Sequence, residues 1–264
     1  MTDVDPCAEL ARWLRGARNV VVLTGAGMSA ESGIPTFREA HAGLWSRFDP
    51  QELASPAAWR RDKALVWGWY AWRMAKVRGA QPHAGHRALA GLGHARSGLT
   101  LVTQNVDDLH ERAGSEDAVH LHGSLFASRC FACARPAGNV ALPPDAADSP
   151  SLRLEPPACT HCGGSIRPGV VWFGEALPQD AWERASQAAR ECEVLIAVGT
   201  SGVVQPAASL PASAKARGAK VAEINPVATD VSNVMDLVWR APAGEALPLL
   251  VAALGKPEVS TQPC

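Results

Sequence analysis

Four of the seven cysteines have a spacing that suits a metal ion. Cys130 and Cys133 are separated by two residues, and so are Cys159 and Cys162, with 25 residues between the two pairs. Four thiolates from two such pairs can close a tetrahedron around Zn²⁺, with Zn–S distances of about 2.3 Å. Because this set leaves no open coordination position, we expect a structural zinc ion, and His161 inside the second pair is then not a ligand.

A zinc ribbon that binds nucleic acid is the alternative interpretation of these cysteines. Residues 126–167 carry four arginines against three acidic residues, which is little excess positive charge for a phosphate backbone. The whole chain of 264 residues has 25 basic and 26 acidic side chains, for a formal net charge of -1. We therefore expect no direct contact with nucleic acid.

His122 is the candidate general base among the eight histidines. It follows the short stretch 118–121 and precedes Gly123, which places its imidazole at the end of an expected strand. An unperturbed histidine titrates near pH 6.5, so it can accept a proton at neutral pH. Most of the other histidines must be structural or solvated.

Polar side chains also follow the expected strand 99–103. Asn105 and Asp107 lie two residues apart, and such a pair can recognise a carboxamide, because Asn offers a donor and an acceptor while Asp accepts. Capping of a helix N-terminus by either residue is the alternative interpretation.

Residues 25–30 (Gly-Ala-Gly-Met-Ser-Ala) satisfy the G-x-G-x-x-A pattern after the expected strand 19–24. Glycines in this pattern let backbone N–H groups approach a pyrophosphate. Gly33 and Pro35 should end the following helix after one or two turns, so the turn leads into a loop that could fold over the nucleotide. A tight glycine turn without a ligand is the alternative.

The only tyrosine, Tyr70, lies three residues before Arg73 in a tryptophan-rich stretch. On a helix the two side chains share a face. A phenol beside a guanidinium can bind a carboxylate. A buried tryptophan stripe, with Tyr70 at its edge and Arg73 extending its charge to solvent, is the alternative.

Apolar strand patterns alternate with helical patterns along most of the chain. This alternation predicts an α/β fold, with a Rossmann-like parallel sheet covered by helices on both faces. Ligands of such sheets bind at the carboxyl ends of the strands. The expected strands are 19–24, 99–103, 194–198, 220–224 and, more weakly, 237–239, and the expected helices are 7–16, 82–92, 179–192 and 206–217.

Two segments interrupt this alternation and should form a smaller lobe within one domain, 1–264. They are the helical insertion 39–80 and the zinc module 126–167. The larger lobe would then consist of residues 1–38, 81–125 and 168–264. With 47% hydrophobic residues, the chain can bury a sizeable core.

The sequence also limits where the protein works. No apolar stretch approaches the roughly 18 residues of a membrane span, and residues 1–6 carry no apolar leader. Cysteines paired for metal and not for disulfides suit a reducing compartment. We expect a cytoplasmic protein without membrane contact. The oligomeric state is not given, and a monomer is compatible with the sequence.

Together these motifs resemble the sirtuin (silent information regulator 2) family of NAD-dependent protein deacylases. They occur in the family's order and cover residues 20–245. The matching segments are residues 25–38, 103–107, 122–123, 170–175, 199–201 and 223–225, with the four cysteines.

The resemblance implies that NAD⁺ is a consumed co-substrate and that acylated lysine side chains of other proteins are the partners. In the family, the acyl oxygen attacks C1′ of the nicotinamide ribose and expels nicotinamide. A histidine, here His122, then activates a ribose hydroxyl, and water finally yields O-acyl-ADP-ribose and free lysine.

The resemblance also implies a role for each matching residue. Asn105 and Asp107 would line the nicotinamide pocket, and Gln104 would contact the ribose. The remaining roles would be phosphate contact for Gly25, Ala26, Gly27 and Ser29, loop closure for Phe37 and Arg38, contact with the adenosine end for Gly199, Thr200, Ser201, Asn225, Pro226 and Ala243, and pairing with the substrate peptide for Val170, Trp172, Phe173 and Gly174.

Within the family, Tyr70 and Arg73 resemble the signature of the class that removes succinyl and malonyl groups, so the resemblance favours the carboxylate receptor. A bare apolar tunnel would leave that carboxylate desolvated. Two other functions stay open: a mono-ADP-ribosyltransferase with the same NAD⁺ site, and a non-catalytic module that binds zinc with NAD or nucleic acid.

Overall fold

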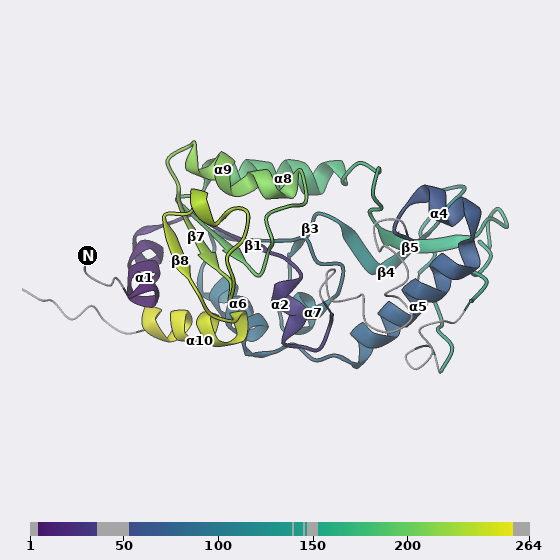
Figure 1. The fold of residues 1–264 in the computed structure, drawn as a ribbon, viewed down its shortest axis with the longest axis horizontal. Coiled ribbons are helices and arrows are strands. Elements are labelled where there is room, and N and C mark those ends of the chain that lie inside the picture. The colour runs from purple at the N-terminus through teal and green to yellow at the C-terminus, as the bar shows by residue number, and fades with distance from the viewer. Residues whose placement is uncertain (1–4, 36–52, 139, 145, 147–152, 256–264) are drawn as a thin grey trace, which may run out of the picture.

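The computed structural model describes residues 5–35, 53–138, 140–144, 146 and 153–255. Its main sheet has six parallel strands in the order β3-β2-β1-β6-β7-β8 (Figure 1). The strand order reverses between β1 and β6, and such a reversal is where open α/β sheets bind their ligands. The strands are β1 Val20–Thr24, β2 Leu99–Thr103, β3 Val119–His120, β6 Val194–Val198, β7 Lys220–Ile224 and β8 Leu237–Trp239.

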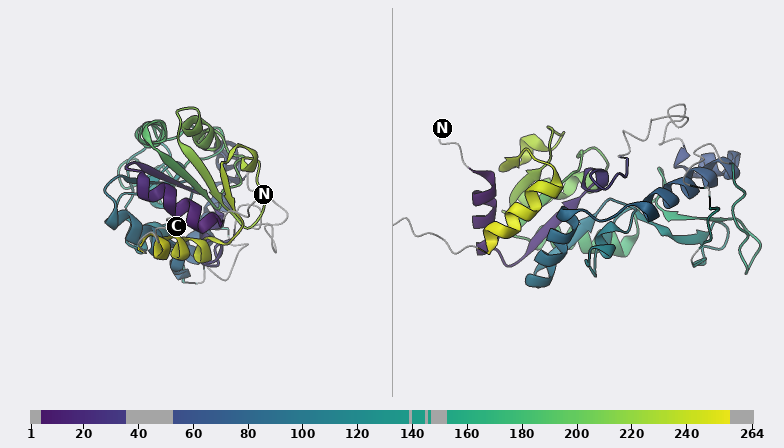
Figure 2. Two further views of the ribbon diagram at one scale, coloured as in Figure 1. Left: turned by 90° about the vertical axis from the view of Figure 1, so that its left-hand side faces the viewer. Right: turned by 90° about the horizontal axis from the view of Figure 1, so that it is seen from below.

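Helices cover both faces of this sheet, as expected. Every residue of β1 and β6 is buried, which explains their continuous apolar runs. One face packs against α1 (Pro6–Gly16), α6 (Ala84–Ala95) and α10 (Ala243–Leu254), and the other against α8 (Gln179–Glu191) and α9 (Leu210–Lys215) (Figure 2). The remaining short helices are α2 Gly27–Ala30, α7 Leu109–Arg112, η3 Ala207–Ser209 and η4 Ser232–Val234.

A second core lies at the other end of the molecule (Figure 1). Here α4 (Pro56–Arg61) and α5 (Lys63–Gly79) pack against an antiparallel hairpin of β4 (Gly123–Cys130) and β5 (Ile166–Val170). This core is rich in tryptophan, as the sequence of α5 indicates.

The zinc-binding module and the helical insertion thus meet in a smaller lobe. Two of the expected lobe boundaries, 125/126 and 167/168, fall inside β4 and β5. The exact division of the chain into lobes stays a prediction. Among the described helices, none combines the length and the apolarity that a membrane crossing needs.

Candidate active site

The turns that follow β1 and β6 are pressed against each other. The N–H of Gly25 donates to the Val198 carbonyl at 3.0 Å, and the N–H of Gly27 donates to the Gly199 carbonyl at 2.8 Å. A Cβ on Gly25 would lie 2.8 Å from Cα of Thr200, and Gly199 has a φ of +59°. Glycine is required here by the contact between two turns. The N–H groups of Gly25 and Gly27, which were expected to face a phosphate, therefore donate to carbonyls of the protein itself.

The turn after β2 joins the first turn through a buried polar cluster. The Ser29 hydroxyl donates to Oδ2 of Asp107 at 2.9 Å and accepts from Nδ2 of Asn105 at 3.1 Å. The N–H of Leu109 donates to Oδ1 of Asp107 at 3.1 Å. Burial raises the pKa of Asp107, and the bonds from Leu109 and Ser29 oppose this shift. The N-cap of α7 is Asp108, which makes no side-chain cap bond, so the capping interpretation is wrong. Asp107 instead accepts from the first N–H of the helix and holds Ser29 at the site.

His122 follows β3 and contacts the turn after β2. Its Nδ1 lies 3.0 Å from the carbonyl oxygen of Gln104, which can only accept, so Nδ1 carries the proton. Burial lowers the pKa of His122, and the Gln104 bond partly opposes this. At neutral pH the imidazole is mostly neutral, with the lone pair on Nε2. Within the described residues, Nε2 has no hydrogen-bond partner.

His120, two residues earlier, is in a different state. Its Nε2 lies 2.6 Å from Oε1 of Glu111, and its Nδ1 lies 3.0 Å from the carbonyl oxygen of Asn105. Burial favours the neutral ring, but the Glu111 carboxylate and the Asn105 carbonyl outweigh it and raise the pKa of His120. Both ring nitrogens lie against acceptors, so neither is free to take a proton from a substrate. This is the physical reason to prefer His122.

Residues at the ends of β6 and β7 continue the crevice. Gln104 Nε2 donates to Oγ1 of Thr200 at 2.9 Å, and Asn225 Nδ2 donates to the Thr200 carbonyl at 3.1 Å. Glu223 is buried and bonds to Arg240 at 2.8 Å, which orders the loop after β7. Ser201 and Pro226 lie on the same two loops.

The start of α10 reaches the first turn as well. The N–H of Gly244 donates to Oε2 of Glu31 at 2.7 Å, and Ala243 itself is buried against α6 at Gly85. The turn after β1, which includes Ala26, therefore lies near Ala243. Phe37 and Arg38 lie outside the described residues.

The four cysteines form one cluster at the far end of β4. Sγ of Cys130 lies 3.5 Å from Sγ of Cys162, and Sγ of Cys133 lies 3.8 Å from Sγ of Cys159. All four sulfurs lie within 4.8 Å of one another. Tetrahedral coordination at the usual Zn–S distance places sulfurs about 3.8 Å apart, so the cluster fits zinc. His161 lies outside the cluster and contacts Arg135.

Tyr70 and Arg73 lie on α5, and Tyr70 is buried in the second core. The Tyr70 hydroxyl accepts a bond from Nε1 of Trp172 at 2.9 Å. The Arg73 guanidinium lies 4.9 Å from the ring centroid of Trp69 and 5.8 Å from that of Tyr70. Burial lowers the pKa of Arg73, and Tyr70 and Asp107 oppose this. Among the described residues, no carboxylate forms an ion pair with Arg73.

The segment expected to pair with a peptide is mostly bonded to its own protein. The N–H groups of Trp172 and Phe173 donate to Glu175 and to the Ala54 carbonyl. Val170 pairs with β4, and the Trp172 side chain is buried. Phe173 and Gly174 are exposed in a turn, and pairing of this segment with a peptide stays a prediction.

A row of three histidines, of which His86 and His110 are buried and His83 is half-buried, was not expected from the sequence. The ring centroids of His83 and His86 lie 4.3 Å apart, and those of His86 and His110 lie 5.0 Å apart. His110 Nε2 contacts the Thr24 hydroxyl at 3.0 Å, and His83 Nε2 contacts the Met28 carbonyl at 2.6 Å. The row thus supports the turn after β1. Spacing alone gives no signal for it, because its members come from two helices.

This row should make stability pH-dependent. Within the described residues, neither ring nitrogen of His86 has a hydrogen-bond partner, and burial lowers its pKa to about 2. Burial also lowers the pKa of His110 to about 4. Below pH 6.5 these two histidines bind protons in the unfolded chain but stay neutral in the folded chain. As the pH is lowered, the free energy of unfolding therefore falls by up to about 1.4 kcal/mol per pH unit for each histidine.

Urea unfolding between pH 7.5 and 5 measures this slope. The variant His86→Leu removes one titrating ring without leaving a partner unsatisfied, and its stability should fall less steeply than that of the wild type. Equal slopes for the two proteins would contradict the assignment.

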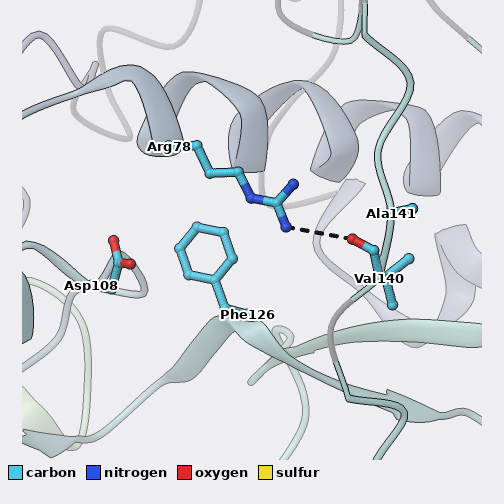
Figure 3. A pocket seen from close by; sticks show the side chains of 5 residues that line it. All are labelled: Arg78, Asp108, Phe126, Val140 and Ala141. Atoms are coloured by element: carbon cyan, nitrogen blue, oxygen red, sulfur yellow. Dashed lines mark hydrogen bonds between the residues drawn. The ribbon is translucent and has the colours of Figure 1, made fainter.

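A pocket of about 540 Å³ lies beside the site, between α5 and β4 (Figure 3). It contains none of the predicted site residues. Arg78 lies 5.6 Å from the ring centroid of Phe126 and donates to the Val140 carbonyl at 3.4 Å. The lining residues are Arg78, Asp108, Phe126, Val140 and Ala141.

A parallel sheet whose order reverses beside polar turns, joined to a four-cysteine cluster, defines a nucleotide-binding α/β protein with a structural metal site. Residues 25–206 match the Sir2 family. The chain belongs to this family.

Relatives and solved structures agree with this assignment. This chain is 56% identical to NAD-dependent protein deacylase 1 of Pseudomonas aeruginosa, over 90% of its own length and 95% of the relative. It is 51% identical to an NAD-dependent protein deacylase of Methylococcus capsulatus over 93% and 96%. Its fold matches a crystal structure of a Sir2 homologue–NAD complex with a TM-score of 0.84 at 47% identity, over 93% of each chain.

Proposed function

We propose that this protein is an NAD-dependent protein-lysine deacylase that prefers acidic acyl groups such as succinyl and malonyl. Its curated relatives are named NAD-dependent protein deacylases. The acyl preference rests on one observation. Arg73 and Tyr70 both offer donors, and among the described residues no acceptor takes the guanidinium protons or the phenol proton. A carboxylate at the end of an acyl chain would satisfy both.

NAD⁺ would lie across the carboxyl ends of β1, β2, β6 and β7. Asn105 offers a donor and an acceptor suited to a carboxamide, and Gln104 and Thr200 lie between the two halves of the crevice. When bound, NAD⁺ supplies a ribose carbon from which nicotinamide can leave. The sheet holds these groups in fixed positions, which removes part of the entropic cost of bringing the reactants together.

His122 would act as the general base. The Gln104 carbonyl holds the proton on Nδ1, so Nε2 is the atom that accepts a proton from a ribose hydroxyl. Burial keeps the imidazole neutral, and therefore basic, at physiological pH. The zinc ion has no part in this step, because its ligands lie at the other end of β4.

The partners would be acylated lysines of other proteins. A Sir2 protein of known structure, 30% identical over 92% of this chain with a TM-score of 0.77, holds a deacetylated p53 peptide. The near-neutral charge of the chain favours neither nucleic acid nor membrane surfaces as partners. Cytoplasmic localisation fits the metal-type cysteine pairs.

Arg73→Met tests the acyl preference. With one peptide carrying acetyl-, succinyl- or malonyl-lysine, the variant should lose about 10- to 150-fold in the ratio of desuccinylation to deacetylation, because only the acidic acyl group loses charge-assisted hydrogen bonds. Nicotinamide release measures each rate. Arg78→Met, on the same helix but in the pocket of Figure 3, is the matched control and should leave the ratio unchanged.

Equal losses on both peptides would contradict the carboxylate receptor but leave the deacylase intact. No nicotinamide release from any acyl peptide would contradict the deacylase itself. Transfer of labelled ADP-ribose to protein in the absence of acyl-lysine would instead identify a mono-ADP-ribosyltransferase.

A further inference from the structure

Tyr70 and Trp172 share a hydrogen bond whose direction is fixed by chemistry. The indole Nε1 of Trp172 lies 2.9 Å from the phenol oxygen of Tyr70, and both side chains are buried. An indole N–H can donate but cannot accept. Tyr70 must therefore accept this bond, and its own proton has to point elsewhere.

The proton of Tyr70 has no acceptor among the described residues. Leaving a buried donor without a partner is unfavourable, so an acceptor brought by a ligand would be bound strongly. Burial also raises the pKa of Tyr70 to about 12, so the phenol keeps its proton at neutral pH. The phenol therefore keeps a proton that it can donate to a ligand. Cζ of Arg73 lies 5.8 Å from the centroid of the Tyr70 ring.

We propose that Trp172 is a specificity-determining positioning residue, which turns the Tyr70 hydroxyl into a donor directed at the carboxylate of an acidic acyl group. This inference rests on the proposed function and deepens it. Without the indole N–H, nothing would fix the direction of the phenol O–H, and part of the carboxylate recognition would be lost.

The surroundings hold the indole ring in place. Cζ of Arg167 lies 3.3 Å from the ring centroid of Trp172, and Arg167 forms an ion pair with Glu175. Oε2 of Glu175 also accepts the backbone N–H of Trp172 at 2.9 Å. The ring of Trp59 packs 5.5 Å away. These contacts leave the indole little freedom to turn its N–H away from Tyr70.

The variant Trp172→Phe removes the N–H and keeps an aromatic ring. We expect the ratio of desuccinylation to deacetylation, in kcat/KM, to fall about five- to tenfold, mainly through a higher KM for the succinyl peptide. In a Tyr70→Phe background the same change should cause no further fall in the ratio. Trp182→Phe on α8 is the matched control, because it trims a tryptophan that packs against a different core, and it should leave the ratio unchanged.

A spectroscopic measurement tests the same point without a variant. Because Tyr70 is the only tyrosine, protein labelled with ¹³C at the tyrosine Cζ gives one tyrosine NMR signal. A succinyl-lysine peptide should shift this signal in the wild type, and an acetyl-lysine peptide should not. A Trp172→Phe protein that folds should show a smaller shift.

Three outcomes would overturn the positioning role. They are an unchanged ratio in Trp172→Phe, an equal fall with and without the Tyr70 hydroxyl, and a Tyr70 signal that ignores the succinyl peptide. In a wild-type enzyme that prefers succinyl-lysine, an unchanged ratio, or an equal fall with and without the Tyr70 hydroxyl, contradicts the role of Trp172 alone. A Tyr70 signal that ignores the succinyl peptide contradicts Tyr70 as the carboxylate donor as well. A wild type that does not act on succinyl-lysine overturns the proposed acyl preference as well.

Discussion

Replacing His122 by asparagine is expected to lower NAD-dependent deacylation by about 100- to 10,000-fold, the usual contribution of a general base. The asparagine amide can still donate to the Gln104 carbonyl, but it offers no basic nitrogen in place of Nε2. The turns after β1 and β6 are untouched, so NAD⁺ affinity should stay within a few-fold of the wild type. Calorimetric NAD⁺ binding and steady-state turnover separate the two effects.

His94→Asn is the matched control for this variant. His94 is exposed near the end of α6, and its replacement should leave turnover unchanged. Activity of His122→Asn within tenfold of the wild type would show that another group removes the proton.

Removal of zinc should unfold the small lobe. Structural zinc sites in small modules contribute on the order of 10 kcal/mol or more, and without the cation the four sulfurs within 4.8 Å of one another lose the ion that joins them. Phe131, next to Cys130, packs 5.9 Å from Trp59 and 6.3 Å from Trp172, so loss of the cluster should disturb the aromatic core. We expect one zinc per chain, released by a chelator only together with the near-ultraviolet circular dichroism signal.

Cys133→Ser should reproduce this loss, whereas Cys7→Ser, outside the cluster, should keep both zinc and fold. A zinc-free protein that retains its near-ultraviolet spectrum and its activity would contradict a structural role. Turnover of the intact protein should need no added metal.

The central sheet could be predicted because its strands are short, continuous apolar runs. Every residue of Val194–Val198 is buried, as expected for a central strand that is covered on both faces. Small and polar residues follow the strand directly and mark its end. The hairpin of β4 and β5 was not predicted. Gly123 pairs with Val170, 47 residues later, and Pro168 and Gly169 hide the strand pattern of β5.

The candidate site, like the fold, was predictable only in part. The cluster of four cysteines could be predicted from residue type and spacing, whereas the roles of His122 and Asn105 stay predictions. Partner choice could not be predicted, because it depends on tertiary contacts. Gly27 serves a neighbouring turn, His120 is held by Glu111, and Trp172 packs in the core while it bonds to Tyr70.

Strand β4 joins two parts of the protein that would otherwise be independent. Its first residue, Gly123, follows the proposed base His122, and its last residue is the zinc ligand Cys130. Side chains alternate between the faces of a strand, so inserting or deleting one residue would reverse the orientation of everything beyond it. Both the position of His122 and that of Cys130 therefore depend on the length of this strand. We expect homologous proteins to tolerate substitutions within β4 far more readily than insertions or deletions.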